Sequence, residues 1–180
     1  LKYDSRVTPL MAAADCGNLE LASLLMAHGG KRFIWSGRKS YYPIGFAARR
    51  SDVKMMQLLL GVDPENEERL IKVDLSEQKI RVHDGEGAEL FASEVSTGKK
   101  GYRTRTGEFV ITNKNRHHVS NIYKGVKMPY FQRFSCGDFG FHEGYCPGYP
   151  ASHGCLRVPR GKAAELWEIT KVGDRVVIVP

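Results

Sequence analysis

Two patterns of apolar and polar residues divide the chain, and the change from one to the other lies between Pro64 and Arg69. Before it, apolar residues such as Leu21, Leu24 and Leu25 recur at the three- and four-residue spacing of amphipathic helices. After it, apolar and polar residues alternate, which is typical of half-buried strands. We therefore predict an α+β chain, with a helical unit over residues 1–68 and a mostly β unit over residues 69–180.

Alternating segments at 70–75 and 79–83 predict a hairpin with a tight turn at 76–78. Further strands are expected at 89–97, 107–112, 129–134 and 175–180, with glycine-rich turns between them. A helix is expected near the end of the chain, where four residues share one face: Ala163, Leu166, Trp167 and Thr170. The second unit is thus predicted to be a sheet with one or two helices.

Within the helical unit, one pattern occurs twice at an offset of 34 residues. The offset aligns Pro9 with Pro43, Ala13 with Ala47, Gly17 with Ser51 and Leu24 with Leu58. A repeat of roughly 33 residues that opens with Thr-Pro-Leu and holds two short helices resembles the ankyrin repeat. The resemblance implies a surface that binds a protein partner, and a structural cap on the second unit is the alternative interpretation. Because about three repeats are needed to bury a solenoid core, we expect either further repeats before Leu1 or docking on the rest of the chain.

Composition and charge narrow the classes of function. The chain has 180 residues, a net charge of +7 and no apolar run long enough to span a bilayer. Residues 1–68 hold nine Lys and Arg against eight Asp and Glu, so the second unit carries most of the positive charge. Such a surface favours anionic partners. The sequence has no basic run with interleaved aromatic residues, the pattern that would indicate nucleic-acid binding. The chain begins without Met or a secretion signal, and we expect such a signal to have been removed or to lie outside this sequence.

Reactive side chains are concentrated in residues 141–159, FHEGYCPGYPASHGCLRVP. A zinc site is one interpretation, but H-x3-C-x6-H-x-C lacks the paired spacing of ordinary structural sites. A buried structural turn is the second interpretation. The third is a thiol nucleophile, Cys155, with His142 as the base that deprotonates it. In that case Gly154 would let backbone amides face a developing oxyanion, and Arg157 would stabilise a thiolate or hold a substrate carboxylate.

The run PASHGCLRVP with the upstream FHEG resembles the signature of the L,D-transpeptidase catalytic domain, also called the YkuD domain. Three further segments resemble parts of the same family: IKVDLSEQKIRVHDGEG, VSTGKKGYRTRTGEFVI and MPYFQRF. The resemblance covers about residues 69–180. Arg105 stands where the family commonly has Pro, and SCGDFG before Phe141 differs from the usual Trp-containing approach. These departures concern the surface and pocket more than the reaction.

The resemblance implies a cysteine acyltransferase that acts on bacterial peptidoglycan stem peptides. Cys155 would be the nucleophile, His142 the general base, and the backbone around Gly154 and Cys155 the oxyanion hole. His153 would orient the site with Ser152, Arg157 would position the loop or a substrate carboxylate, and Tyr130 would form part of the substrate wall. No metal or organic cofactor is needed for acyl transfer through cysteine. The family also implies a periplasmic or cell-envelope location and acylation by carbapenems.

Alternatives with the same site remain open. Water in place of an acceptor amine would make the protein an L,D-carboxypeptidase or an editing hydrolase, and an inactive wall-binding module with ankyrin-mediated protein binding is a further possibility. Cys136 and Cys146 could pair as a disulfide in an oxidising envelope. His117 and His118 are interpreted as solvated loop residues.

Overall fold

The computed structural model describes residues 7–34, 42–65 and 68–180. Two helix pairs come first: α1 (Pro9–Cys16), α2 (Leu19–Ala27), α3 (Pro43–Arg49) and α4 (Val53–Leu60). The remaining elements are β1 (Arg69–Asp74), β2 (Lys79–Asp84), β3 (Glu89–Glu94), β4 (Gly107–Val119), β5 (Lys127–Phe134), β6 (Gly140–Glu143), β7 (Leu156–Val158), α5 (Lys162–Ile169) and β8 (Arg175–Val179). The fold is therefore α+β, as the residue pattern predicts.

Short polar side chains cap the start of α1, α2 and α4. Thr8, Asn18 and Asp52 each accept a hydrogen bond from the backbone amide three residues on, at 3.2, 2.9 and 3.0 Å. Gly17 ends α1 in the left-handed conformation that glycine adopts without strain. At the equivalent position of the second repeat, Ser51 also has a positive φ of 55°. Its hydroxyl accepts a hydrogen bond from the Glu108 amide at 3.2 Å, which gives this serine a role that glycine could not fill.

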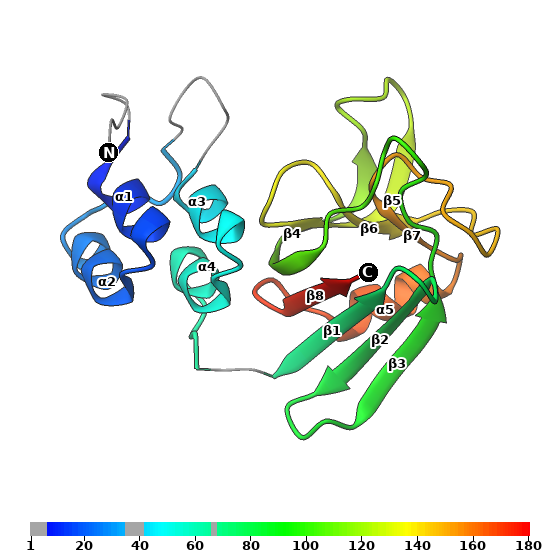
Figure 1. Ribbon diagram of the computed structural model, residues 1–180, viewed down its shortest axis with the longest axis horizontal. Helices are drawn as coiled ribbons and strands as arrows, with labels where there is room; N and C mark the ends of the chain where they lie inside the picture. Colours follow the sequence, from blue (N-terminus) through cyan, green and yellow to red (C-terminus); the bar gives the residue numbers. More distant parts are fainter. Residues whose placement is uncertain (1–6, 35–41, 66–67) are drawn as a thin grey trace.

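The strands form one sheet in the order β3-β2-β1-β8-β4-β5-β6-β7. Neighbouring strands are antiparallel except for the β1–β8 and β6–β7 pairs, which are parallel. The register of β4 against β5 shifts between Ile111 and Asn113, and β4 belongs to both halves of the sheet. Figure 1 shows the β1–β3 and β8 half below the β4–β7 half. The two halves face each other.

One apolar core fills the space between these halves. Ile71 and Phe91 contribute to it from one side, and Phe134 and Phe141 contribute from the other. Leu166 of α5 completes the same cluster. Aromatic rings pack edge to face here: the centroids of Phe134 and Phe141 are 4.8 Å apart at 84°.

All six predicted strands are confirmed. Two short strands, β6 and β7, were not predicted, and one confirmed strand, β4, is longer than predicted. β6 and β7, which carry the candidate site, have four and three residues and show no alternation long enough to detect. β4 extends to Val119, beyond the predicted end at residue 112. The interpretation of His117 and His118 as loop residues is therefore wrong, because both lie on a strand that pairs with β5.

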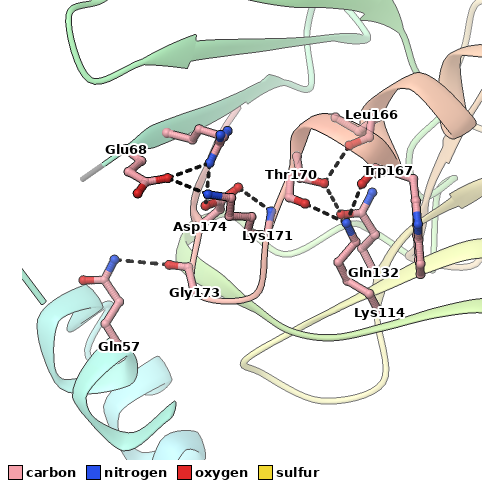
Figure 2. A network of polar contacts seen from close by, with 11 residues as sticks. Gln57, Glu68, Lys114, Gln132, Leu166, Trp167, Thr170, Lys171, Gly173 and Asp174 are labelled. Atoms are coloured by element: carbon pink, nitrogen blue, oxygen red, sulfur yellow. Dashed lines mark hydrogen bonds and ion pairs between the residues drawn. The ribbon is translucent and has the colours of Figure 1, made fainter. Parts of the chain in front are cut away.

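The helix pairs pack against the sheet through α4 and β4. Val110 of β4 belongs to the apolar cluster of the helices, together with Met55, Met56 and Leu59. The side-chain amide of buried Gln57 donates a hydrogen bond of 3.1 Å to the carbonyl of Gly173, which precedes β8 (Figure 2). Of the two expected arrangements, docking on the rest of the chain is thus observed.

The outer side of the first repeat remains exposed. Leu21 is 41% exposed, whereas Met55, the residue 34 positions later, is completely buried. Leu24 is also exposed, so the predicted apolar stripe of α2 is only partly covered by the described residues. Of the helices that the structure describes, none combines the length and apolarity required to cross a membrane.

Candidate active site

A neighbouring segment holds the loop that bears Cys155 at both ends. Ser96 and Arg157 exchange two backbone hydrogen bonds of 2.9 and 3.0 Å. The carbonyl of Thr97 accepts bonds of 2.9 Å from the amides of Ala151 and Ser152. Buried Gln78 fixes Thr97 in turn, because its side chain bonds both the Thr97 hydroxyl and the Thr97 amide, at 2.8 and 3.0 Å. The segment at 96–98 therefore acts as the frame of the loop.

Ser152 and Thr104 shape the backbone immediately before Cys155. The Ser152 hydroxyl accepts a hydrogen bond from the Gly154 amide at 3.0 Å and donates one to the Cys155 carbonyl at 2.5 Å. The Thr104 hydroxyl donates to the Gly154 carbonyl at 2.9 Å. Gly154 has a φ of 115°, a conformation that side-chain-bearing residues rarely adopt. These bonds explain why Ser and Gly stand at these positions.

The side chains of β5, β6 and β7 alternate between the core and the outer face of the sheet. Phe141 pairs with Leu156, and both lie in the core. The next pair, His142 and Arg157, is therefore directed to the outer face. Cys155 directly precedes β7, packs partly against the core cluster, and has the backbone amide of Gly140 bonded to its sulfur.

His142 is held in one tautomer by the carbonyl of Glu143. Its Nδ1 lies 2.7 Å from that oxygen, and a carbonyl oxygen can only accept, so Nδ1 carries the proton. Burial lowers the pKa of His142 to about 4, while the bond to Glu143 acts in the opposite direction and Arg157 lowers the pKa further. His142 is thus neutral at pH 7 with a free lone pair on Nε2, which is the state a general base requires.

The thiol of Cys155 is half-buried and protonated in the resting state. Burial raises its pKa, while the Gly140 backbone amide and the charges of Arg133 and Arg157 act in the opposite direction. Within the described residues no hydrogen bond joins the Cys155 sulfur to the ring of His142. Proton transfer would therefore accompany nucleophilic attack instead of preceding it as a stable ion pair.

A cavity of about 90 Å³ opens beside Cys155 on the outer face. The connection between β4 and β5 contributes Ile122 and Tyr123 to its lining, and Arg133 and Asp138 add opposite charges. His118, which sequence analysis assigned to a solvated loop, also lines it and stacks on Phe131 with centroids 4.4 Å apart. A larger hollow of about 380 Å³ lies near Cys146 but is not lined by Cys155. We therefore identify the candidate site by the reactive side chains that line a cavity and not by the volume of the cavity.

The other expected site residues divide into two groups. His153 is exposed and lines the cavity, between the rings of Tyr102 and Tyr123 at 4.4 and 5.3 Å. Arg157 packs its aliphatic stem where a side chain on Gly144 would stand. Tyr130, in contrast, packs against Trp167 of α5 with centroids 6.0 Å apart and is not among the residues that line the cavity.

The remaining cysteines are free. Cys136 accepts a hydrogen bond from the Arg105 guanidinium at 2.9 Å, and the Cys146 thiol donates to the Arg157 carbonyl at 3.2 Å. The disulfide considered from the sequence is therefore not formed in this structure. Across the described part of the chain, no group of three or more His, Cys, Asp or Glu side chains is placed to hold a metal ion.

Comparison with solved structures finds L,D-transpeptidases. The L,D-transpeptidase from Stackebrandtia nassauensis is 23% identical, with 88% of each chain covered and a TM-score of 0.59. The enzyme from Mycobacterium smegmatis is 19% identical over 63% of this chain and 59% of its own, with a TM-score of 0.56. L,D-transpeptidase 3 from Mycobacterium tuberculosis, with a faropenem-derived adduct, is 17% identical over 63% of this chain and 60% of its own, with a TM-score of 0.55. The chain thus spans about three fifths of the length of the two mycobacterial enzymes.

Comparison with family models gives two matches. The ankyrin repeat model matches residues 6–33, which include α1 and α2. The model of the L,D-transpeptidase catalytic domain, YkuD, matches residues 68–178, more than half of the chain. No curated protein matches the chain. With this match over the sheet, the loop that bears Cys155 and α5, the chain belongs to the L,D-transpeptidase (YkuD) catalytic domain family and carries an ankyrin repeat ahead of that domain.

Proposed function

We propose that the protein transfers acyl groups between peptidoglycan stem peptides through Cys155. The thiol attacks the carbonyl of the L-centre of diaminopimelate in a donor tetrapeptide, and its proton passes to Nε2 of His142 and then to the departing D-Ala. The thioester that remains is attacked by the side-chain amine of an acceptor diaminopimelate. This second step forms an amide crosslink and regenerates the thiol.

One observation carries this proposal: His142 lies on β6 beside β7, the strand that Cys155 directly precedes, and His142 is locked as the neutral Nδ1–H tautomer. A neutral base beside a protonated thiol needs no metal or cofactor to start acyl transfer. The match of family and fold adds support, since both hold for the domain that contains these residues.

The amide of Cys155 is the better candidate for the oxyanion donor. The Gly154 amide already donates to the Ser152 hydroxyl at 3.0 Å, whereas no described residue accepts a hydrogen bond from the Cys155 amide. Gly154 then contributes through its conformation, which turns the next amide toward the reacting carbonyl. His153 orients the site from between Tyr102 and Tyr123, and Arg157 positions the loop.

Water and an amine compete for the same thioester. If water attacks the thioester, the protein acts as an L,D-carboxypeptidase. The product therefore depends on the acceptor, because the nucleophile Cys155 is the same in both reactions. We place the reaction in the periplasm or cell envelope, where stem peptides occur and where an excess of basic residues attracts an anionic wall. The exposed side of α2, with Leu21 and Leu24, is the part of the ankyrin repeat that we propose for a protein partner.

The test is the intact mass of the protein after incubation with a diaminopimelate tetrapeptide and, separately, with imipenem, a carbapenem found in complex with another L,D-transpeptidase. We expect an adduct with either compound, and D-Ala release, for wild type but not for Cys155→Ala. Products of the peptide reaction separate crosslinking from hydrolysis.

Cys146→Ala is the matched control. Cys146 is also half-buried and lies nine residues before Cys155, but its thiol donates to the Arg157 carbonyl and it does not line the cavity beside Cys155. This variant should keep the adduct. An adduct that persists in Cys155→Ala would reject Cys155 as the nucleophile, and the absence of adduct and D-Ala release in wild type under reducing conditions would favour an inactive wall-binding module.

A further inference from the structure

A pair of opposite charges lies directly beside the candidate nucleophile. Arg133 of β5 is in register with Gly140 of β6, and the Gly140 amide points to the Cys155 sulfur. Arg133 and Cys155 therefore both lie next to Gly140, where no side chain stands between them. Its guanidinium donates a hydrogen bond to the carboxylate of Asp138. Both charged residues line the cavity that Cys155 lines.

The loop that bears Asp138 is anchored on both sides. On one side, the Ser135 amide donates to the Val110 carbonyl at 3.0 Å. On the other, Phe139 is buried, with its ring 5.3 Å from that of Phe109 and 5.0 Å from that of Phe134. Asp138 itself is 62% exposed, while the Arg133 side chain is 27% exposed. The carboxylate is thus held in place and still open to a ligand.

An ion pair at this exposure contributes little to stability, so holding the fold together does not account for it. A guanidinium has five donor hydrogens, and binding Asp138 leaves others free for a second carboxylate. The Asp138 carboxylate retains lone pairs for an ammonium group. The pair is therefore complementary to a ligand that carries an ammonium and a carboxylate on the same carbon.

We propose that Arg133 and Asp138 form a subsite for the free amino-acid end of the diaminopimelate side chain in the donor stem, with Arg133 binding its carboxylate and Asp138 its ammonium. This inference rests on the proposed function, because the donor carbonyl must lie at Cys155. A side chain that ends in an ammonium alone, as in lysine, satisfies Asp138 but brings a positive charge toward Arg133 without a partner for it. The subsite therefore selects diaminopimelate over lysine at the third position of the stem.

Three donor tetrapeptides separate the two contacts: one with unmodified diaminopimelate, one with its side-chain carboxyl amidated, and one with its side-chain amine acetylated. For wild type, we expect kcat/KM for D-Ala release to fall about tenfold or more with either modification, because hydrogen bonds to charged groups are lost. In Arg133→Gln the amidated and unmodified donors should become nearly equivalent, while the penalty for acetylation remains. Asp138→Asn should show the reverse.

Ratios between donors are the decisive quantity, because loss of Arg133 also raises the pKa of Cys155 and slows every acylation. Arg81→Gln is the matched control: Arg81 forms a similarly exposed pair with Glu77 at 2.9 Å on β2, away from the cavity, and should leave all ratios as in wild type. Circular dichroism checks that each variant is folded.

Binding of the three donors to Cys155→Ala, measured by calorimetry, gives the same comparison without turnover. If wild type reacts with all three donors equally well, the proposed function stands and the subsite is rejected. If wild type reacts with imipenem and the variants change all donors by one common factor, Arg133 and Asp138 act only on the thiol and the subsite is again rejected. If wild type neither reacts with imipenem nor releases D-Ala, and Cys155→Ala binds no donor, both proposals fall.

Discussion

At the scale of single residues, the protonation of His142 is set by its surroundings and not by its intrinsic basicity. One carbonyl fixes its tautomer, and burial keeps its pKa near 4. The unfolded chain, by contrast, gives histidine a pKa of about 6.5. The protonation state of this proposed general base is therefore linked to the stability of the fold.

This link predicts a loss of stability in acid. Above pH 6.5 the His142 ring is neutral in both states; as the pH falls toward 4, only the unfolded state binds the proton, which favours unfolding. We expect the free energy of unfolding to fall by about 3 kcal/mol more between pH 7 and pH 4 in wild type than in His142→Gln. Urea denaturation at several pH values measures both slopes. Equal slopes would mean that His142 titrates normally in the folded protein.

The candidate site could be located from the sequence at this scale, because the SHGC run and the upstream histidine are local in sequence; the roles of these residues stay predictions. The charged pair could not, since Arg133 and Asp138 have no sequence signature of their own. His118 was misassigned because its neighbours are polar and exposed, while the ring itself stacks on Phe131. Tyr130, which we expected in the substrate wall, has a positive φ of 55° and packs on Trp167.

At the scale of elements, the short strands β6 and β7 do more for the site than the long ones. They were not predicted because three or four residues carry no usable periodicity, and their partners lie far away in sequence. β6 pairs with β5 because the backbones of the two strands approach each other closely. Gly140 makes this possible, since a Cβ there would lie 2.0 Å from the Gln132 carbonyl oxygen.

Gly140→Ala should therefore separate β6 from β5. We expect a loss of about 3 kcal/mol in the free energy of unfolding, because the clash is with backbone that cannot rotate away. Gly87→Ala is the control: its φ of 89° is strained for alanine, but nothing lies within 4 Å of the added methyl, so about 1 kcal/mol should be lost. Guanidinium denaturation compares the two. A smaller loss in Gly140→Ala than in Gly87→Ala would show that the strand pair can shift to admit the methyl.

At the scale of the whole molecule, the helices and the sheet are joined by buried polar bonds as well as by apolar packing. The Gln57–Gly173 bond connects the second repeat to the turn before β8 (Figure 2). Val62 also lies close to Gly173. Residue patterns predicted two units but not their contact surface, because Val110 and Gln57 have nothing in their sequence context that marks an interface.

Gln57→Ala tests whether the two units unfold together. Removing the amide leaves the Gly173 carbonyl without this partner and should lower the free energy of unfolding by about 1–3 kcal/mol. If the contact couples the units, hydrogen–deuterium exchange will increase in β8 and β4 as well as in α4. Exchange that increases in α4 alone would show that the repeats open independently of the sheet.

β8 lies between β1 and β4 although it follows every other strand along the chain. Until residues 175–179 have left the ribosome, β1–β3 and β4–β7 can form local hairpins but cannot join as one sheet, because the strand that links them is missing. The helix pairs also wait for this part of the chain, because α4 packs against β4 and Gln57 bonds to Gly173, which precedes β8. We therefore expect a nascent chain to hold helices that lack their docking surface and a Cys155 that lacks its surroundings, so that both are completed only when β8 has been translated.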